Sequence, residues 1–289
     1  MEMESYKQKI DIWGGIECSI NRVNDTYQDQ CELLGHYLRI DDDIESFADL
    51  GISKLRFPVL WEKHQPFPGK EIDWTFSERS LGLLSRKNIT PILGLVHHGS
   101  GPAHVNFFDG SFEEGLAAYA HEVASRFPWA EYYTPVNEPL TTARFCALYG
   151  LWYPHRATER DFFQVLLSEC KATVLAMKAI RAVNPKAKLV QTEDLGKIHS
   201  TPLLQYQADY ENQRRWLSLD LLCGKVGPSH PLWSHLLKSG VAKKQLQFFL
   251  DNPCPPDICG FNHYITSERY LDEHLDDYPA SAHGGNGKH

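Results

Sequence analysis

The segment Tyr132-Tyr133-Thr134-Pro135-Val136-Asn137-Glu138-Pro139 starts as an apolar run and ends in two polar residues before a proline. A run that stops in this way predicts a buried β-strand followed by a turn. Comparable runs lie on both sides of it, at 12–16, 54–60, 90–96, 187–191 and 257–261. Segments with the apolar spacing of helices lie between the runs, at 42–50, 77–86, 112–126 and 161–183. The alternation predicts βα units whose strands form a parallel sheet.

The early strands of this series are evenly spaced along the chain. Glu138 lies 41 residues after His97, and His97 lies 41 residues after Arg56, whereas the later intervals are longer. A doubly wound sheet is the competing α/β architecture, but the segment that starts at Trp13-Gly14-Gly15 lacks the Gly-x-Gly-x-x-Gly fingerprint. The pattern therefore favours a (β/α)8 barrel of the TIM type. Only six βα units are recognisable, so we expect the barrel to be incomplete in this chain.

We expect one domain and a tail. Residues 1–271 are predicted to form the incomplete (β/α) barrel, and residues 272–289 a polar loop or frayed end rich in Gly, Pro and His. A barrel of six units leaves its first and sixth strands with unpaired edges, which are unstable in water. We therefore expect the missing strands to come from further polypeptide or from a second chain.

Composition and charge exclude several classes of partner. The chain has 29 Lys and Arg against 37 Asp and Glu, a net charge of −8, which argues against a nucleic-acid binder. No apolar run reaches the roughly 18 residues of a membrane span. The first ten residues, MEMESYKQKI, lack the apolar stretch of a secretory signal, and the seven cysteines include no CxxC pair. These features predict a cytoplasmic protein with reduced thiols, and they do not indicate an oligomeric state.

The predicted strand ends carry the candidate functional residues, because chemistry in such barrels occurs at the carboxyl ends of the strands. They combine carboxylates and amides with an arginine and aromatic rings, a lining that suits the hydroxyl groups and ring faces of a sugar. We expect a small glycoside or oligosaccharide as partner, with no cofactor and no metal. His97 and His98 are expected to point to opposite faces of their strand, which argues against a metal site. The candidates are Glu17, Arg56, Trp61, His97, Asn137, Glu138, Gln191, Glu193, Asn262 and Tyr264.

The segment Asn137-Glu138-Pro139 resembles the Asn-Glu-Pro of the family 1 glycoside hydrolases, the retaining β-glucosidase-like enzymes, in sequence and in its place on the fourth strand. The resemblance implies that Glu138 is the general acid/base and that Asn137 binds the 2-hydroxyl of the sugar. The alternative interpretation is a surface glutamate in the loop after a strand.

Further matches to this family follow in order along the chain. Trp13-Gly14 resembles its first strand, and Asn21 stands where the family has a sugar-binding glutamine. Leu55-Arg56-Phe57 with Trp61 resembles the second strand, which implies that Arg56 hydrogen-bonds the nucleophile. Leu95-Val96-His97-His98 resembles Leu-Tyr-His-Trp, which implies that His97 holds a sugar hydroxyl. Segment 260–267, GFNHYITS, resembles the sixth strand, places Asn262 in the site and implies that Tyr264 touches the nucleophile.

Three other features leave alternatives open. Glu193 is interpreted either as a barrel-lining residue or as a substrate contact. For Glu17 we consider, in this order, sugar binding, a pair with Arg56 and the role of nucleophile. Arg214-Arg215-Trp216 suggests either an anion or sugar clamp or, as the favoured interpretation, a solvated helix face with one buried indole.

The second catalytic carboxylate of the family is absent from this sequence. Retaining glycosidases need two carboxylates about 5 Å apart, and the family's nucleophile lies in a Thr-Glu-Asn-Gly motif on strand seven, which does not occur here. We therefore expect the front part of a longer retaining β-glycosidase, inactive alone, with its nucleophile beyond residue 289. The alternative is a non-catalytic carbohydrate-binding protein on a glycosidase scaffold. An aldolase-type barrel ranks last, because no lysine stands at a strand end for a Schiff base.

Overall fold

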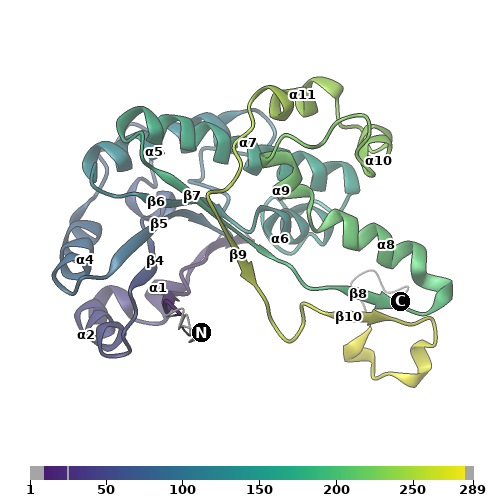
Figure 1. Ribbon diagram of the computed structural model, residues 1–289, viewed down its shortest axis with the longest axis horizontal. Coiled ribbons are helices and arrows are strands. Elements are labelled where there is room, and N and C mark those ends of the chain that lie inside the picture. Colours follow the sequence, from purple (N-terminus) through teal and green to yellow (C-terminus); the bar gives the residue numbers. More distant parts are fainter. Residues whose placement is uncertain (1–9, 25, 284–289) are drawn as a thin grey trace, which may run out of the picture.

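The computed structural model describes residues 10–24 and 26–283. Its main sheet is a curled part of a barrel (Figure 1), in which neighbouring strands are parallel and follow one another as they do in the sequence. This arrangement confirms the incomplete TIM barrel with six βα units. The strands, in sheet order, are β1 (Trp13–Gly15), β4 (Lys54–Pro58), β5 (Thr90–His97), β6 (Tyr132–Asn137), β7 (Lys188–Asp194) and β9 (Ile258–Asn262).

The central strands are buried on both faces, because helices cover the outside of the sheet and side chains fill the inside. Every residue of β5 after Thr90 is buried, and β6 is buried after Tyr132. Such strands are near-continuous apolar runs, which is why the sequence revealed them. The six predicted strands are each found within about three residues of their predicted bounds.

The helices pack around this sheet. The longest, α7, has 25 residues, and the Thr158 hydroxyl caps its first turn by accepting from the Asp161 amide at 3.1 Å. It packs against α5 and β6. The α-helices are α1 (Gln30–Leu33), α2 (His36–Asp49), α3 (Trp61–His64), α4 (Thr75–Arg86), α5 (Ser111–Arg126), α6 (Pro139–Ala143), α7 (Glu159–Val183), α8 (Gln205–Arg214), α9 (Leu217–Leu222), α10 (Trp233–Lys238) and α11 (Lys243–Asp251).

Short elements outside the predicted set complete the fold. A hairpin of β2 (Ile20–Val23) and β3 (Thr26–Asp29) follows β1, and β8 (Ile198–Ser200) pairs in parallel with β10 (Arg269–Leu271). In Figure 1, β8, β10 and α8 lie together at the end of the molecule opposite α2 and α4. Within residues 10–24 and 26–283, four single-turn segments remain: the π-helix η1 (Arg144–Leu148) and the 3-10 helices η2 (Pro202–Leu204), η3 (Leu275–Asp277) and η4 (Ala280–Ala282).

The main sheet ends at β1 on one side and at β9 on the other. Residues on these end strands are more exposed than those of the central strands: Trp13 is 39% and Phe261 61% exposed. The two end strands of the open barrel are therefore more exposed to solvent than the central strands, as the six-unit interpretation requires.

The chain after β10 makes only the short turns η3 and η4 in its described part. The end of the predicted tail, 284–289, and most of the polar start, 1–9, lie outside the described residues. In the part of the chain that is described, no helix has the length and apolar character needed to cross a membrane. All seven cysteines are free thiols.

Candidate active site

Glu138 sits at the turn between β6 and α6. Its backbone is left-handed, with φ 46° and ψ 61°, and Pro139 starts the helix immediately after it. Few residues other than glycine adopt this conformation, so surrounding contacts must hold it. The residue is only 2% exposed. Its burial excludes the alternative of a surface loop glutamate.

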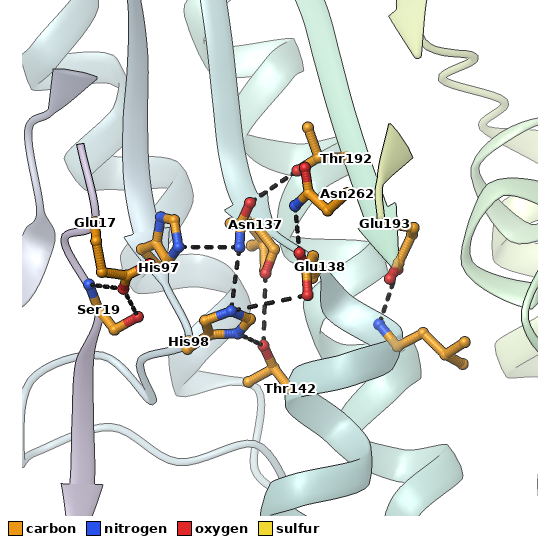
Figure 2. Close-up of polar contacts among 12 residues, drawn as sticks. Glu17, Ser19, His97, His98, Asn137, Glu138, Thr142, Thr192, Glu193 and Asn262 are labelled. Atoms are coloured by element: carbon orange, nitrogen blue, oxygen red, sulfur yellow. Dashed lines mark hydrogen bonds and ion pairs between the residues drawn. The ribbon is translucent and has the colours of Figure 1, made fainter. Parts of the chain in front are cut away.

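The Glu138 carboxylate lies next to two side chains from other strands, Asn262 at the end of β9 and His98 just after β5 (Figure 2). Its Oε1 accepts a hydrogen bond from the Asn262 side-chain amide at the end of β9. Its Oε2 lies 3.8 Å from Nε2 of His98, which is too long for a hydrogen bond. One oxygen is therefore fixed by an amide, and the other has no direct hydrogen bond to this histidine.

Asn137 precedes Glu138, is 1% exposed and is bonded at every position of its amide. Its Oδ1 accepts from Arg56 at 2.6 Å and from the Thr192 hydroxyl at 2.8 Å. Its Nδ2 lies 3.2 Å from His97 Nε2 and 3.4 Å from His98 Nε2. An arginine only donates, so it assigns the oxygen to its own side and the NH2 group to the two histidines.

Both histidines suit this role when they are neutral. Burial lowers the pKa of His97 well below its usual value, with further lowering by His98 and Arg56. Burial also lowers the pKa of His98, against the opposing effect of Glu138. A neutral imidazole that accepts at Nε2 carries its proton on Nδ1. In that tautomer, His98 Nδ1 donates to the Thr142 hydroxyl at 2.9 Å, while His97 Nδ1 faces Cys18 Sγ at 3.3 Å.

The prediction that His97 and His98 face opposite sides is wrong. His97 is the last residue of β5, and His98 has φ 54°, so the strand alternation stops between them. The left-handed residue turns the second imidazole back toward Asn137, as Figure 2 shows. The two rings converge on an amide, with ring centroids 5.0 Å apart.

Glu193 is completely buried near the start of α6. Its Oε1 accepts from the Leu140 amide at 2.9 Å, one of the first-turn N–H groups that the helix itself cannot satisfy. Burial raises the pKa of this carboxyl to about 8, against the lowering effect of the Leu140 amide. This geometry supports the barrel-lining interpretation of Glu193 over a substrate contact.

Of the remaining candidates, Trp61 and Gln191 are buried. Glu17, Asn21 and Tyr264 lie nearer the surface. Glu17 is exposed, and its carboxylate accepts from the backbone and hydroxyl of Ser19. In Figure 2, His97 and Asn137 lie between Glu17 and Glu138. Asn21 is half-buried on β2, and Tyr264 is 56% exposed after β9.

Electrostatics relate these surface residues to Glu138. Burial raises the pKa of the Tyr264 phenol, and the charges of Glu138 and Glu17 raise it further. Glu17, Glu138 and Tyr264 come after the carboxyl ends of the parallel strands β1, β6 and β9, so they share one end of the sheet. Arg56, which the sequence offered as a partner for Glu17, donates to Asn137 and, at 3.4 Å, to Thr192.

The favoured interpretation of Arg214-Arg215-Trp216 is wrong. Arg214 is 7% exposed, whereas Trp216 is 45% exposed, the reverse of a solvated helix face with a buried indole. The Arg214 guanidinium lies over the rings of Phe162 and Tyr210. Aromatic faces and the ion pair with Glu211, at 3.4 Å, offset the cost of burying this charge.

One group in the described residues has the spacing of metal ligands, Asp272, Glu273 and His274, whose ligand atoms lie within 4.8 Å. It lies in the segment after β10, where Asp272 and Glu273 are half-buried and His274 is exposed. His274 already lies 2.8 Å from Asp272 there.

Sequence reasoning missed Thr192 and Thr142 and assigned no role to His98. Thr192 lies on β7, one position before Glu193. Nothing in the sequence around it indicates that its hydroxyl contacts Asn137. The family-like segment at His97-His98 indicated a side chain beside the site, but not its direction.

Comparison with known proteins agrees with this arrangement. Residues 11–219 match the sequence profile of glycosyl hydrolase family 1. A phospho-cellobiase from Klebsiella oxytoca is 24% identical over 162 residues, which are 53% of this chain and 35% of the relative. An aryl-phospho-β-D-glucosidase from Bacillus subtilis is 23% identical over 261 residues, 81% of this chain and 52% of the relative. The chain thus spans about a third to a half of the length of these relatives.

Solved structures show the same fold. A β-glucosidase from Thermotoga maritima matches with a TM-score of 0.76 at 18% identity, over 92% of this chain and 67% of the other. The AHE enzyme from Alicyclobacillus herbarius matches with a TM-score of 0.69 at 22% identity, over 79% of this chain and 55% of the other. The sequence profile covers well over half of the chain and the structures share its barrel: this chain belongs to glycosyl hydrolase family 1.

Proposed function

We propose that this chain is the acid/base half of a retaining β-glycosidase, with Glu138 as the general acid/base. The observation that carries the proposal is the buried carboxylate at the end of β6, held by Asn262 next to the fully bonded amide of Asn137. Such a carboxyl group donates a proton to the leaving oxygen and later takes one from water. Asn262 engages Oε1, which leaves Oε2 to carry the proton.

Asn137 has a contact that a sugar hydroxyl can replace. Its Nδ2 lies 3.4 Å from His98 Nε2, the longest of the four contacts of its amide. A 2-hydroxyl that accepts from this N–H replaces a weak hydrogen bond with a better one. Arg56 and Thr192 keep the amide oriented for that exchange.

The nucleophile of this proposal lies in polypeptide beyond residue 289. Within the described residues, both hydrogen bonds of Arg56 leave from NH1. Its Nε and NH2 groups are therefore available to a carboxylate from a seventh strand, which they would hold ionised and ready to attack. The 289-residue chain alone then binds glycoside without turning it over.

The test compares leaving groups in the full-length protein. Glu138→Gln should lower kcat/KM for alkyl β-glycosides by at least about a hundredfold, and much less for nitrophenyl β-glycosides, whose leaving group needs no proton. Glu114→Gln, on the exposed face of α5, is the matched control and should leave both rates unchanged. Equal losses for both substrates would remove Glu138 from the acid/base role.

The substrate series should contain each nitrophenyl β-glucoside with and without a 6-phosphate. The curated relatives include a phospho-cellobiase and a 6-phospho-β-glucosidase, whereas the solved structures include a β-glucosidase. We propose a β-linked glucoside-type substrate, and the ratio of the two kcat/KM values decides between the phosphorylated and the free sugar.

A non-catalytic carbohydrate-binding protein is the second candidate function. It is favoured by the absence of Thr-Glu-Asn-Gly from the 289 residues. Full-length protein that binds glucosides in calorimetry but hydrolyses none of the series would establish this alternative and reject the first.

A further inference from the structure

A small polar pocket lies between η1, the end of β7, the end of α8 and the loop that leads to β10. Arginines from three of these elements line it, namely Arg144, Arg214, Arg215 and Arg269. Two carboxylates, Asp194 and Glu211, also line it, so positive charge is in excess by two. We refer to it as the arginine pocket.

Several donors in the arginine pocket are buried without a partner. Nε of Arg144 and both Nε and NH1 of Arg215 have no hydrogen bond in the described part of the chain. Burial lowers the pKa of Arg215, against the raising effect of the Asp194 and Glu211 carboxylates, and the charges of Arg144 and Arg214 lower it further. Leaving charged donors buried and unbonded is costly, so an acceptor is expected to occupy this space.

Two backbone segments beside the arginine pocket, at Gly196 and Ser267, lie unusually close together. A Cβ atom at Gly196 would lie 2.0 Å from the carbonyl oxygen of Ser267, so only glycine lets these two segments touch. The contact brings Ser267 and Arg269 to the side of β7 where Asp194 lies. The Ser267 oxygen accepts from the Tyr264 amide at 2.8 Å, which leaves its hydroxyl proton to donate.

Size and donor geometry select the ligand. The cavity volume is about 40 Å³, which at roughly 10–15 Å³ per water holds about three waters. A tetrahedral oxyanion fits this space, whereas a pyranose ring does not. Guanidinium groups that converge from different elements suit several oxygens on one atom.

We propose that the arginine pocket binds a phosphate-type oxyanion, either free phosphate or the phosphoryl group of a sugar phosphate. Arg144 and Arg215 supply the main hydrogen-bond donors to the anion. Arg269 and Ser267 contact it from the opposite side of the pocket. Arg214, whose guanidinium lies over the Phe162 ring, adds positive charge. Asp194 opposes the anion and sets an upper limit on its affinity. The site does not depend on the role of Glu138.

The test measures binding of inorganic phosphate to the 289-residue chain by calorimetry and thermal melting, at constant ionic strength maintained with sodium chloride. We expect one saturable site. Arg215→Met should weaken phosphate binding about tenfold or more. Arg86→Met removes an equal charge from the exposed face of α4 and should change nothing.

Asp194→Asn should strengthen phosphate binding severalfold, because it removes the opposing charge. Misfolding cannot produce such a gain in affinity, so this variant separates a direct effect on the site from a loss of structure. Tighter binding of glucose 6-phosphate than of phosphate identifies a sugar phosphate as the ligand, and equal binding identifies the free anion. Unchanged phosphate affinity in both Arg215→Met and Asp194→Asn, or no saturable binding to the parent chain, would overturn the proposal.

Discussion

Two carboxyl groups, Glu193 on β7 and Glu169 on α7, are completely buried in this protein. Burial raises the pKa of both, and Glu193 raises that of Glu169 further. At neutral pH, Glu193 is therefore a neutral acid whose oxygen accepts from the amide of Leu140. That contact secures the first turn of α6 and, through it, the left-handed backbone of Glu138.

We predict that Glu193 makes the protein less stable as the pH rises. The unfolded carboxyl loses its proton near pH 4.5, whereas the folded one keeps it up to about pH 8. Between these values the folded state binds more protons, so stability falls with increasing pH, by at most about 1.4 kcal/mol per pH unit for one group. Glu193→Gln keeps the acceptor and removes the titration.

Urea unfolding at pH 5 and pH 8 measures this effect. The difference in unfolding free energy between the two pH values should be smaller in Glu193→Gln than in the parent chain. Glu114→Gln should retain the parent's difference, since Glu114 is exposed on α5. An identical pH dependence in all three proteins would show that Glu193 does not titrate in this range.

At the scale of elements, the loop between β9 and β10 is positioned by the end of β7. Gly196 allows the contact with Ser267, and β10 then pairs with β8. β5 and β6 each end just before a residue with a positive φ angle, His98 and Glu138 respectively. The site is thus shaped at three strand ends by departures from regular strand geometry.

Gly196→Ala should destabilise the protein by about 1–3 kcal/mol, because the new methyl group has no space against backbone atoms. Gly82→Ala is the matched control. Its Cβ atom would meet only the flexible end of Arg86 at 3.7 Å within α4, so we expect a gain of about 0.5–1 kcal/mol. Chemical denaturation of both variants measures the difference, and equal stability would refute the close approach.

At the scale of the whole molecule, the inner strands of the main sheet are paired on both edges, whereas each end strand has one unpaired edge within the described residues. β5 and β6 have neighbours on both sides, whereas β9 pairs only with β7 within the described residues. Free strand edges open more readily than central strands.

We therefore predict that amide hydrogen exchange at neutral pH is fastest, among the six main strands, in β1 and β9 and slowest in β5 and β6. Peptide-resolved mass spectrometry measures it. Protection of β9 equal to that of β5 would mean that another copy of the chain covers the edge, which sedimentation would then detect as a dimer.

The sequence determined which segments become strands and where each of them ends. Apolar runs report burial within a single element, so all six strands of the main sheet were predictable from residues such as Leu93 and Val136. The ends of those runs located Asn137 and Glu138, and the family-like motifs supplied their expected roles. The short elements from β8 to α11 were not predicted, because the pieces are small and their patterns are weak.

Tertiary structure alone decided how the side chains meet. His98 turns toward Asn137 through a positive φ, a property of the backbone that no apolar period reveals. Asn262 reaches Glu138 across 124 positions of sequence because β7 spaces their strands at one edge of the sheet. The arginine pocket likewise depends on the approach of Gly196 to Ser267. Sequence patterns record each residue's burial, whereas contacts between elements follow from register and loop geometry, which only the folded chain specifies.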